Sequence, residues 1–137
     1  MKHIYSIIEA IFYISFGGLI YYLIEILFRG YSHYSMFFCG GIIFYCISLF
    51  NRRYFCSLHI ITRAIIAAFI ITFIELLFGI LLNLYLHMQV WDYSNQYYNY
   101  KGQICLTFSI LWFFLSFPVL SMDSFIQKQL HKFIFHA

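Results

Sequence analysis

The stretch WDYSNQYYNYKGQICLTFSILW, from Trp91 to Trp112, decides how the rest of the chain is interpreted. Its first half is polar and aromatic, and its second half is apolar without an intervening break. An apolar run of this kind favours a helix. We therefore predict a compact polar loop that leads directly into a membrane-spanning helix.

The composition places the whole chain in a bilayer. Of its 137 residues, 64% are hydrophobic and 9% are charged, whereas about a quarter of the residues of a soluble domain are charged. The mean hydropathy is +0.83. The net charge of +3 is dispersed, and no basic run is longer than Arg52 and Arg53. This distribution does not favour nucleic acid as a partner and is typical of topology signals.

Four apolar segments are candidate membrane spans, because a spanning helix needs about 20 mostly apolar residues. They cover residues 4–28, 34–50, 60–86 and 104–120. We predict an all-α fold in which residues 1–121 form a four-helix transmembrane bundle in the lipid bilayer. Residues 122–137 place apolar side chains on one side and Lys128 and Lys132 on the other. This pattern predicts a short C-terminal interfacial helix on the cytoplasmic face of the membrane.

The positions of lysine and arginine predict the orientation. With four spans, six basic residues fall on one side of the membrane: Lys2, Arg52, Arg53, Arg63, Lys128 and Lys132. The other side has Arg29 and Lys101. Because cytoplasmic loops carry the excess of basic residues, we predict a multi-pass protein of the cell membrane with both termini in the cytoplasm. Arg63, one turn into the third span, is expected to snorkel back to the headgroups.

Small and polar residues recur at helical spacing along three spans, as they do at helix–helix interfaces in membranes. In the first span they are Ser15, Gly18, Tyr22, Glu25 and Arg29. In the third span they are Ala64, Ala68, Thr72, Glu75, Gly79 and Asn83. In the fourth they are Gly102, Cys105, Ser109, Trp112 and Ser116. We expect these faces to line one bundle interior.

Four ionisable residues, Glu25, Arg29, Glu75 and Asp92, form the centre of the candidate site. An ionisable group inside a membrane is costly and is by default a functional hypothesis. We predict that the four converge near the outer third of the bundle, beneath a lid formed by residues 91–102. Their surplus negative charge would be met by a proton, a cation or a cationic ligand group. Three interpretations stay open: a structural salt-bridge network, a binding site, and two glutamates acting as general acid and base.

The loop adds five residues to the candidate site: Trp91, Tyr93, Ser94, Asn99 and Gly102. Aromatic residues at a membrane surface are usually interface anchors, but anchors need no interleaved Asp, Ser and Asn. His33 and His87 lie at the outer helix ends near Asp92, yet without the spacing of a metal site, so we predict no metal. Because neither a phosphate-binding loop nor a GxGxxG motif occurs, we also predict no cofactor.

The loop residues also carry a family resemblance. The matching positions are WDYS at Trp91–Ser94, Asn99, Gly102, ICL at Ile104–Leu106, Ser109 and Trp112, supported by Glu25, Arg29–Gly30 and Glu75. They resemble the small polytopic bacterial membrane proteins classed as type IV ABC-transporter permeases. Residues 35–45, SMFFCGGIIFY, lack the proline-containing segment that is usual in that family. The resemblance implies membrane transport with a separate ATPase as motor. Because a four-helix chain of this size has little interior, we also predict a homo-oligomer or a partner membrane subunit.

Three functions follow as candidates. We favour a membrane component of a transport system that recognises a small ligand or ion at its extracytoplasmic face. The alternative is a membrane-embedded enzyme acting on a lipid or cell-envelope headgroup, with Glu25 and Glu75 as acid and base. The residues identify no catalytic group and argue more for binding than for catalysis. The third candidate is a non-catalytic membrane assembly protein.

Overall fold

The structure, a computed structural model, describes residues 2–54 and 57–136, with side chains described for 6–54 and 57–133. The domain bounds 1 and 137 and the side chain of Lys2 lie outside the described part. The elements are α1 (Lys2–Arg29), α2 (Tyr34–Tyr54), α3 (Ile60–Gly79), the π-helix η1 (Ile80–Tyr85), strands β1 (Asn99–Tyr100) and β2 (Ile104–Cys105), and α4 (Leu106–His136). This confirms the predicted all-α architecture.

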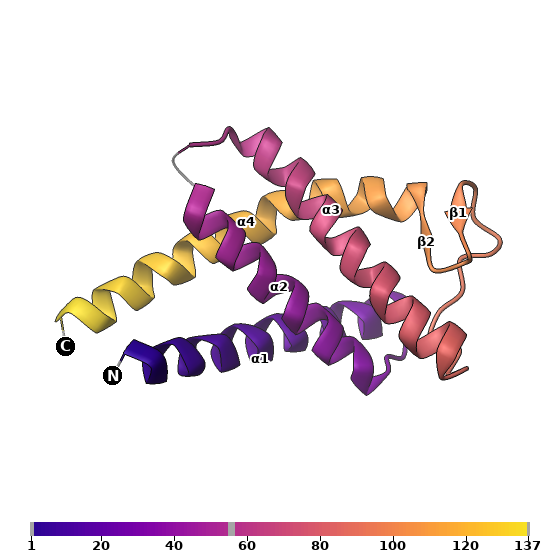
Figure 1. Ribbon diagram of the computed structural model, residues 1–137, viewed down its shortest axis with the longest axis horizontal. Coiled ribbons are helices and arrows are strands. Elements are labelled where there is room, and N and C mark those ends of the chain that lie inside the picture. Colours follow the sequence, from indigo (N-terminus) through magenta and orange to yellow (C-terminus); the bar gives the residue numbers. More distant parts are fainter. Residues whose placement is uncertain (1, 55–56, 137) are drawn as a thin grey trace.

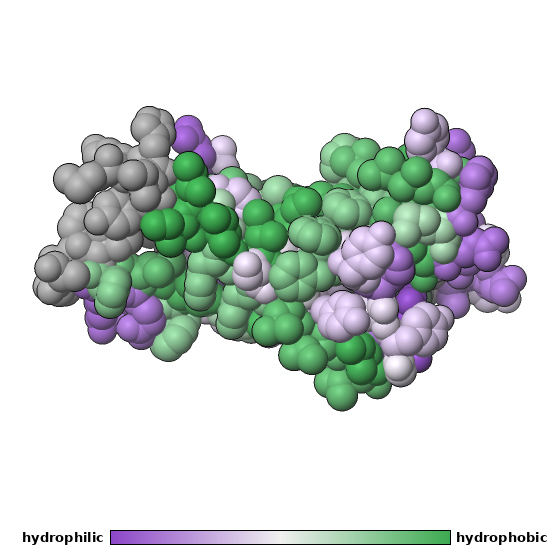
Figure 2. Space-filling model, turned by 90° about the horizontal axis from the view of Figure 1, so that it is seen from below, coloured by the Kyte–Doolittle hydropathy of each residue, from purple (hydrophilic) through white to green (hydrophobic). Residues whose placement is uncertain are grey.

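Four helices in the described part are long and apolar enough to cross a membrane. Their candidate spans are Ser6–Arg29, Tyr34–Tyr54, Ile60–Tyr85 and Leu106–Phe133. A helix suits these runs because it satisfies its backbone donors and acceptors internally, as hydrocarbon requires. Figure 2 shows apolar side chains over the middle of the molecule and polar side chains gathered towards its two ends. The chain is therefore a multi-pass membrane protein.

The helices form two hairpins. α1 packs against α2 and α3 packs against α4, while α2 and α3 join the hairpins (Figure 1). The start of α1, the end of α2, the start of α3 and the end of α4 lie at one end, here called the terminal end, and residues 30–33 and 86–105 lie at the other, the loop end. The core between the hairpins is built from Cys39, Ile43, Ile47, Ala64, Ala67, Ile71 and Leu120.

Glycines bring α1 and α2 into backbone contact. A Cβ on Gly18 would collide with the Phe37 carbonyl, and one on Gly41 would collide with the Ile14 carbonyl. Small residues allow such close approach in membranes. The predicted face of the first span is correct at Gly18 but wrong at Ser15, which is exposed. The surface of α1 that contacts α2 is centred on the glycines and lies to one side of the predicted face of small and polar residues.

The predicted inward face of the third span is confirmed where its residues are buried, namely at Ala64, Ala68, Glu75 and Gly79. α3 passes directly into η1, and the helical stretch ends at Tyr85, close to the predicted end at residue 86. His87 and Gln89 then have positive φ angles of 54° and 50°. Because side chains rarely adopt this region, these two residues mark where the chain turns from the helix into the loop.

The fourth span differs from the prediction at both ends. Residues 104–105 form β2, and α4 runs from Leu106 through Pro118 to His136 as one helix. This corrects the prediction of a separate short helix over residues 122–137. A proline removes one backbone donor from a helix, but packing continues beyond it. Leu120 and Asp123 are 1% and 0% exposed, and these contacts hold the two halves of α4 in one helix.

Asp123 belongs to a polar node at the terminal end. Asn51 Nδ2 donates to Asp123 Oδ2 at 2.6 Å, and Arg63 Nη1 donates to Asn51 Oδ1 at 2.6 Å. Arg63 is 7% exposed, so the expectation that it snorkels to the headgroups is wrong, because buried acceptors draw it into the bundle. Arg52 Nη2 lies 2.8 Å from Glu9 Oε1. These contacts link all four helices at the terminal end.

Candidate functional site

The loop between η1 and α4 is held by its own side chains. Asp92 Oδ1 accepts hydrogen bonds from the Ser94 amide at 2.9 Å and from the Ser94 hydroxyl. These bonds favour the ionised carboxylate and hold the pKa of Asp92 below its ordinary value. Gly102 has a φ of +70°, and a Cβ there would come within 2.7 Å of Asp92 Oδ1. The spacing of Asp92, Ser94 and Gly102 is thus explained by a tight turn.

Asn99 closes the same loop. Its Nδ2 donates to the carbonyls of Ser94 at 3.2 Å and Gln96 at 2.9 Å, and its Oδ1 accepts from the Gly102 amide at 3.0 Å. β1 and β2 pair antiparallel, with Asn99 opposite Cys105. The polar residues that distinguish this loop from an aromatic belt therefore serve first to fix its shape.

An amide pair that the sequence analysis did not place in the site joins the loop to η1. Asn83 Oδ1 accepts from the Val90 amide at 2.7 Å, and Asn83 Nδ2 donates to Gln103 Oε1 at 2.8 Å. The indole of Trp91 donates to the Gln103 carbonyl at 3.0 Å. Asn83 was visible as part of the polar stripe of the third span, whereas nothing in the local pattern indicated that Gln103 is buried.

Glu75 lies beneath the loop and is 4% exposed. Its two oxygens accept hydrogen bonds from the Tyr93 hydroxyl at 3.0 Å and from the Trp112 indole at 3.1 Å. Burial, followed by the nearby Glu75 carboxylate, raises the pKa of Tyr93, so this hydroxyl stays a donor. The ring of Tyr93 also stacks on Phe108 with centroids 4.7 Å apart. Neutral donors, rather than a cation, therefore satisfy Glu75 among the described residues.

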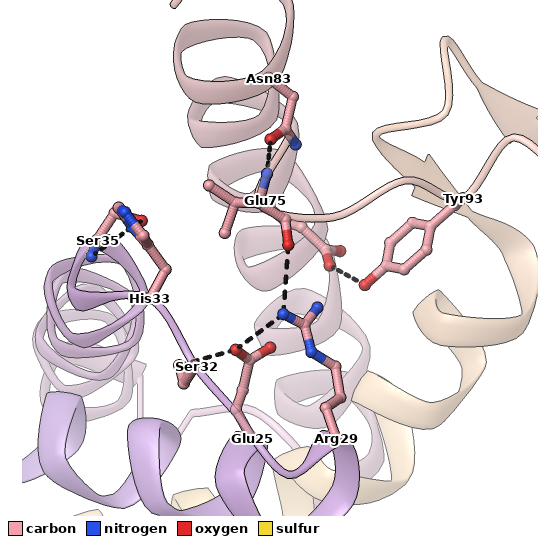
Figure 3. Close-up of polar contacts among 9 residues, drawn as sticks. Glu25, Arg29, Ser32, His33, Ser35, Glu75, Asn83 and Tyr93 are labelled. Carbon is pink, nitrogen blue, oxygen red and sulfur yellow. Dashed lines mark hydrogen bonds and ion pairs between the residues drawn. The ribbon is translucent and has the colours of Figure 1, made fainter. Parts of the chain in front are cut away.

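Glu25 and Arg29 form a second group at the end of α1 (Figure 3). Arg29 Nη2 lies 3.9 Å from Glu25 Oε2, and Ser32 Oγ donates to the same oxygen at 3.0 Å. Arg29 Nη2 also donates to the Val90 carbonyl at 3.2 Å. The guanidinium lies over the Tyr31 ring at 4.8 Å. Arg29 thus connects the first hairpin to the loop.

The four ionisable residues that were predicted to converge have different partners. Glu25 and Arg29 are adjacent. Glu75 is tied to the loop by Tyr93. Asp92 is exposed and bonds to Ser94. Its role is therefore in the loop, apart from the two glutamates.

A cleft of about 740 Å³ opens at the loop end between the end of α1, η1 and the loop. Its charged lining residues are Arg29, Lys101 and Asp92. Aromatic side chains, among them Tyr31, Trp91 and Phe108, complete the wall. The glutamates do not line the cleft, so its charged groups are two cations and one carboxylate. Its net charge is therefore positive, whereas a negative surplus was predicted. Lys101 is missing from the predicted site, although it is one of two basic residues assigned to this side.

The histidines considered as metal ligands have other positions. His33 Nδ1 accepts from the Ser35 amide at 3.2 Å at the start of α2. His87 is exposed at the turn after η1. Within residues 6–54 and 57–133, no group of three His, Cys, Asp or Glu side chains is placed to hold a metal ion.

Comparison with known proteins gives one family. Residues 10–136 match the model of the family described as "Putative ABC-transporter type IV". No curated protein and no solved structure matches the chain. The family match runs from α1 to the end of α4 and includes the loop that builds the cleft. The chain therefore belongs to the type IV ABC-transporter family.

Proposed function

We propose that this chain is the membrane subunit of a transport system and that it binds a small ligand in the loop-end cleft, on the extracytoplasmic side. The observation that carries the proposal is the cleft itself. Its volume of about 740 Å³ lies within the range of ligand pockets in proteins. Its lining combines aromatic rings with polar and charged side chains, which can fix the orientation of a bound ligand.

Arg29 supports binding over a purely structural network. Its ion pair with Glu25 is long, at 3.9 Å, and its Nε has no hydrogen-bond partner among the described residues. Its side chain keeps 28% exposure in the cleft wall. Lys101 lines the same cleft, with its ammonium 5.6 Å from the Tyr100 ring. Two cations in the wall of one cleft favour a ligand with an anionic group.

The glutamates fit a structural role better than acid–base catalysis. Both oxygens of Glu75 already accept hydrogen bonds, from Tyr93 and from Trp112. Glu25 accepts from Ser32 and faces Arg29. Neither carboxylate lines the cleft, so a substrate bound there would meet Arg29 and Lys101 first. We therefore prefer transport to a headgroup-modifying enzyme.

The orientation and the partners belong to the same proposal. The basic residues Arg52, Arg53, Lys128 and Lys132 lie on elements of the terminal end, which supports a cytoplasmic position for that end by the positive-inside rule. A separate ATP-hydrolysing subunit would then act from the terminal end. Further helices would come from a partner membrane subunit or a second copy of the chain.

The test is a binding screen followed by uptake. Purified protein in nanodiscs is unfolded by heat in the presence of anionic, zwitterionic and cationic solutes. We expect anionic solutes to raise the melting temperature, Lys101→Gln to reduce that rise, and Lys128→Gln, an exposed lysine of the terminal end, to leave it unchanged. Cells lacking the gene should lose uptake of the best solute. No stabilising solute, or unchanged uptake, would refute the proposal.

A further inference from the structure

A second, apolar cavity lies in the membrane part of the bundle. It is a groove of about 190 Å³ between α1 and α4, with α2 as its floor. Ile20 and Tyr21 line it from α1, Phe44 from α2, and Leu115 and Val119 from α4. It exists because α1 packs mainly on α2 and α4 mainly on α3. The two outer helices therefore leave an apolar gap between them.

A row of neighbouring aromatic rings runs from the groove to the cleft. Trp112 and Tyr21 line the groove, and their ring centroids are 6.2 Å apart. Phe108, whose centroid is 6.4 Å from that of Trp112, lines the cleft. One face of α4 thus carries a ring of the cleft and, one turn later, a ring of the groove. A molecule with a polar head and an apolar chain could occupy both spaces.

The lining of the groove selects its occupant. The groove holds about 190 Å³ between apolar side chains of α1, α2 and α4, which leaves room for part of one hydrocarbon chain. The polar end supplies the other half of the recognition. Arg29 and Lys101 outnumber Asp92 there, and one oxygen of Asp92 is already bonded to Ser94.

We propose that the cleft and the groove form one site for a single phospholipid with a net negative headgroup. The phosphate lies at Arg29 and Lys101, and one acyl chain lies between α1 and α4. The proposal rests on the ligand-binding role of the cleft and names the class of its ligand. The lipid enters from the leaflet at the loop end.

The two tryptophans of the chain allow a direct measurement. Trp112 lines the groove and Trp91 lines the cleft, so Trp91→Phe leaves a single reporter beside the proposed acyl chain. Phosphatidylglycerol with brominated chains, added to the protein in neutral detergent, should quench Trp112 saturably at one lipid per chain. Brominated phosphatidylcholine should need about tenfold more lipid, because the choline cation of its headgroup is repelled by Arg29 and Lys101. The wild-type protein, with both tryptophans, is titrated in parallel.

Two pairs of variants locate the lipid. Lys101→Gln should raise the phosphatidylglycerol concentration needed for quenching to that of phosphatidylcholine. Lys128→Gln should leave that concentration unchanged. Ile20→Phe fills the groove and should abolish saturable quenching. Leu19→Phe, one residue away and 52% exposed on the lipid side, should leave it unchanged. Equal quenching by both headgroups, or no effect of Ile20→Phe, would show bulk lipid contact only and overturn the proposal.

A soluble headgroup analogue separates this proposal from the one on which it rests. Glycerol 3-phosphate carries the phosphate without the acyl chains. If it raises the melting temperature while brominated phosphatidylglycerol does not quench saturably, the cleft binds a soluble anion and the lipid proposal falls alone. If neither binds, both proposals fall.

Discussion

The hydrogen bond between Tyr93 and Glu75 gives the sharpest test of how the loop is attached to the membrane helices. Tyr93→Phe removes the hydroxyl that donates to Glu75 Oε1 at 3.0 Å and keeps the ring that stacks on Phe108. Because Glu75 is buried, water cannot easily replace the lost donor. Leaving a buried acceptor unsatisfied costs about 1–3 kcal/mol, so the free energy of unfolding should fall by that amount.

The loop contains its own matched control. Tyr97 is 86% exposed, and Tyr97→Phe should change the free energy of unfolding by less than about 0.5 kcal/mol. Both variants are measured by denaturant titration in the same detergent, with circular dichroism as the signal. A double-mutant cycle with Glu75→Gln then isolates the pair. Residues in direct contact show coupling energies of about 0.5–3 kcal/mol.

Two results would refute the reasoning. If Tyr93→Phe and Tyr97→Phe unfold at the same denaturant concentration, the contact with Glu75 contributes nothing measurable. If the losses in Tyr93→Phe and Glu75→Gln simply add, the two residues act independently and the loop is attached by other contacts, such as the Asn83 and Gln103 pair.

Three further predictions concern the loop and the orientation. Gly102→Ala should lower stability by about 1–3 kcal/mol more than Gly30→Ala, since both glycines have positive φ but only Gly102 has atoms within 4 Å of an added Cβ; equal effects in thermal unfolding would contradict this. Because the pKa of Asp92 is lowered in the folded loop, its ionised carboxylate stabilises the loop at pH values above its ordinary pKa of 3.8. This stabilisation is lost as the pH falls through the lower pKa of the folded state. Trp91 emission in a Trp112→Phe background should therefore change on strong acidification and should stop doing so in Asp92→Asn. In a cysteine-free background, Asn95→Cys should react with an impermeant maleimide on intact cells and Arg53→Cys only after permeabilisation, and the reverse pattern would invert the proposed orientation.

Local features of the fold could be predicted from the sequence because they depend on short spacings. The four spans follow from apolar runs, and the inward face of α3 follows from Ala64, Ala68 and Glu75 at helical intervals. The pairing of Glu25 with Arg29 is likewise a contact over one turn. In each case the partners lie on one helix, so periodicity alone brings them together.

The partners of buried polar groups could not be predicted, because they come from distant segments. Glu75 is bonded to Tyr93 and Trp112, which are 18 and 37 residues away, whereas a proton, a cation or a cationic ligand group was predicted to meet its charge. Asp123 lies in a stretch that resembles an amphipathic tail. It is nevertheless buried and accepts a hydrogen bond from Asn51, 72 residues away. The same distant contact explains why α4 continues where a separate helix was predicted.

The backbone contact between α1 and α2 determines how the molecule can move. Facing carbonyls lie against Gly18 and Gly41 with no room for a methyl group, so one helix cannot slide or roll on the other without a collision. We therefore expect the first hairpin to keep its internal geometry as one rigid unit. The hydrogen bond between Asn51 and Asp123 joins this unit to α4 at the terminal end.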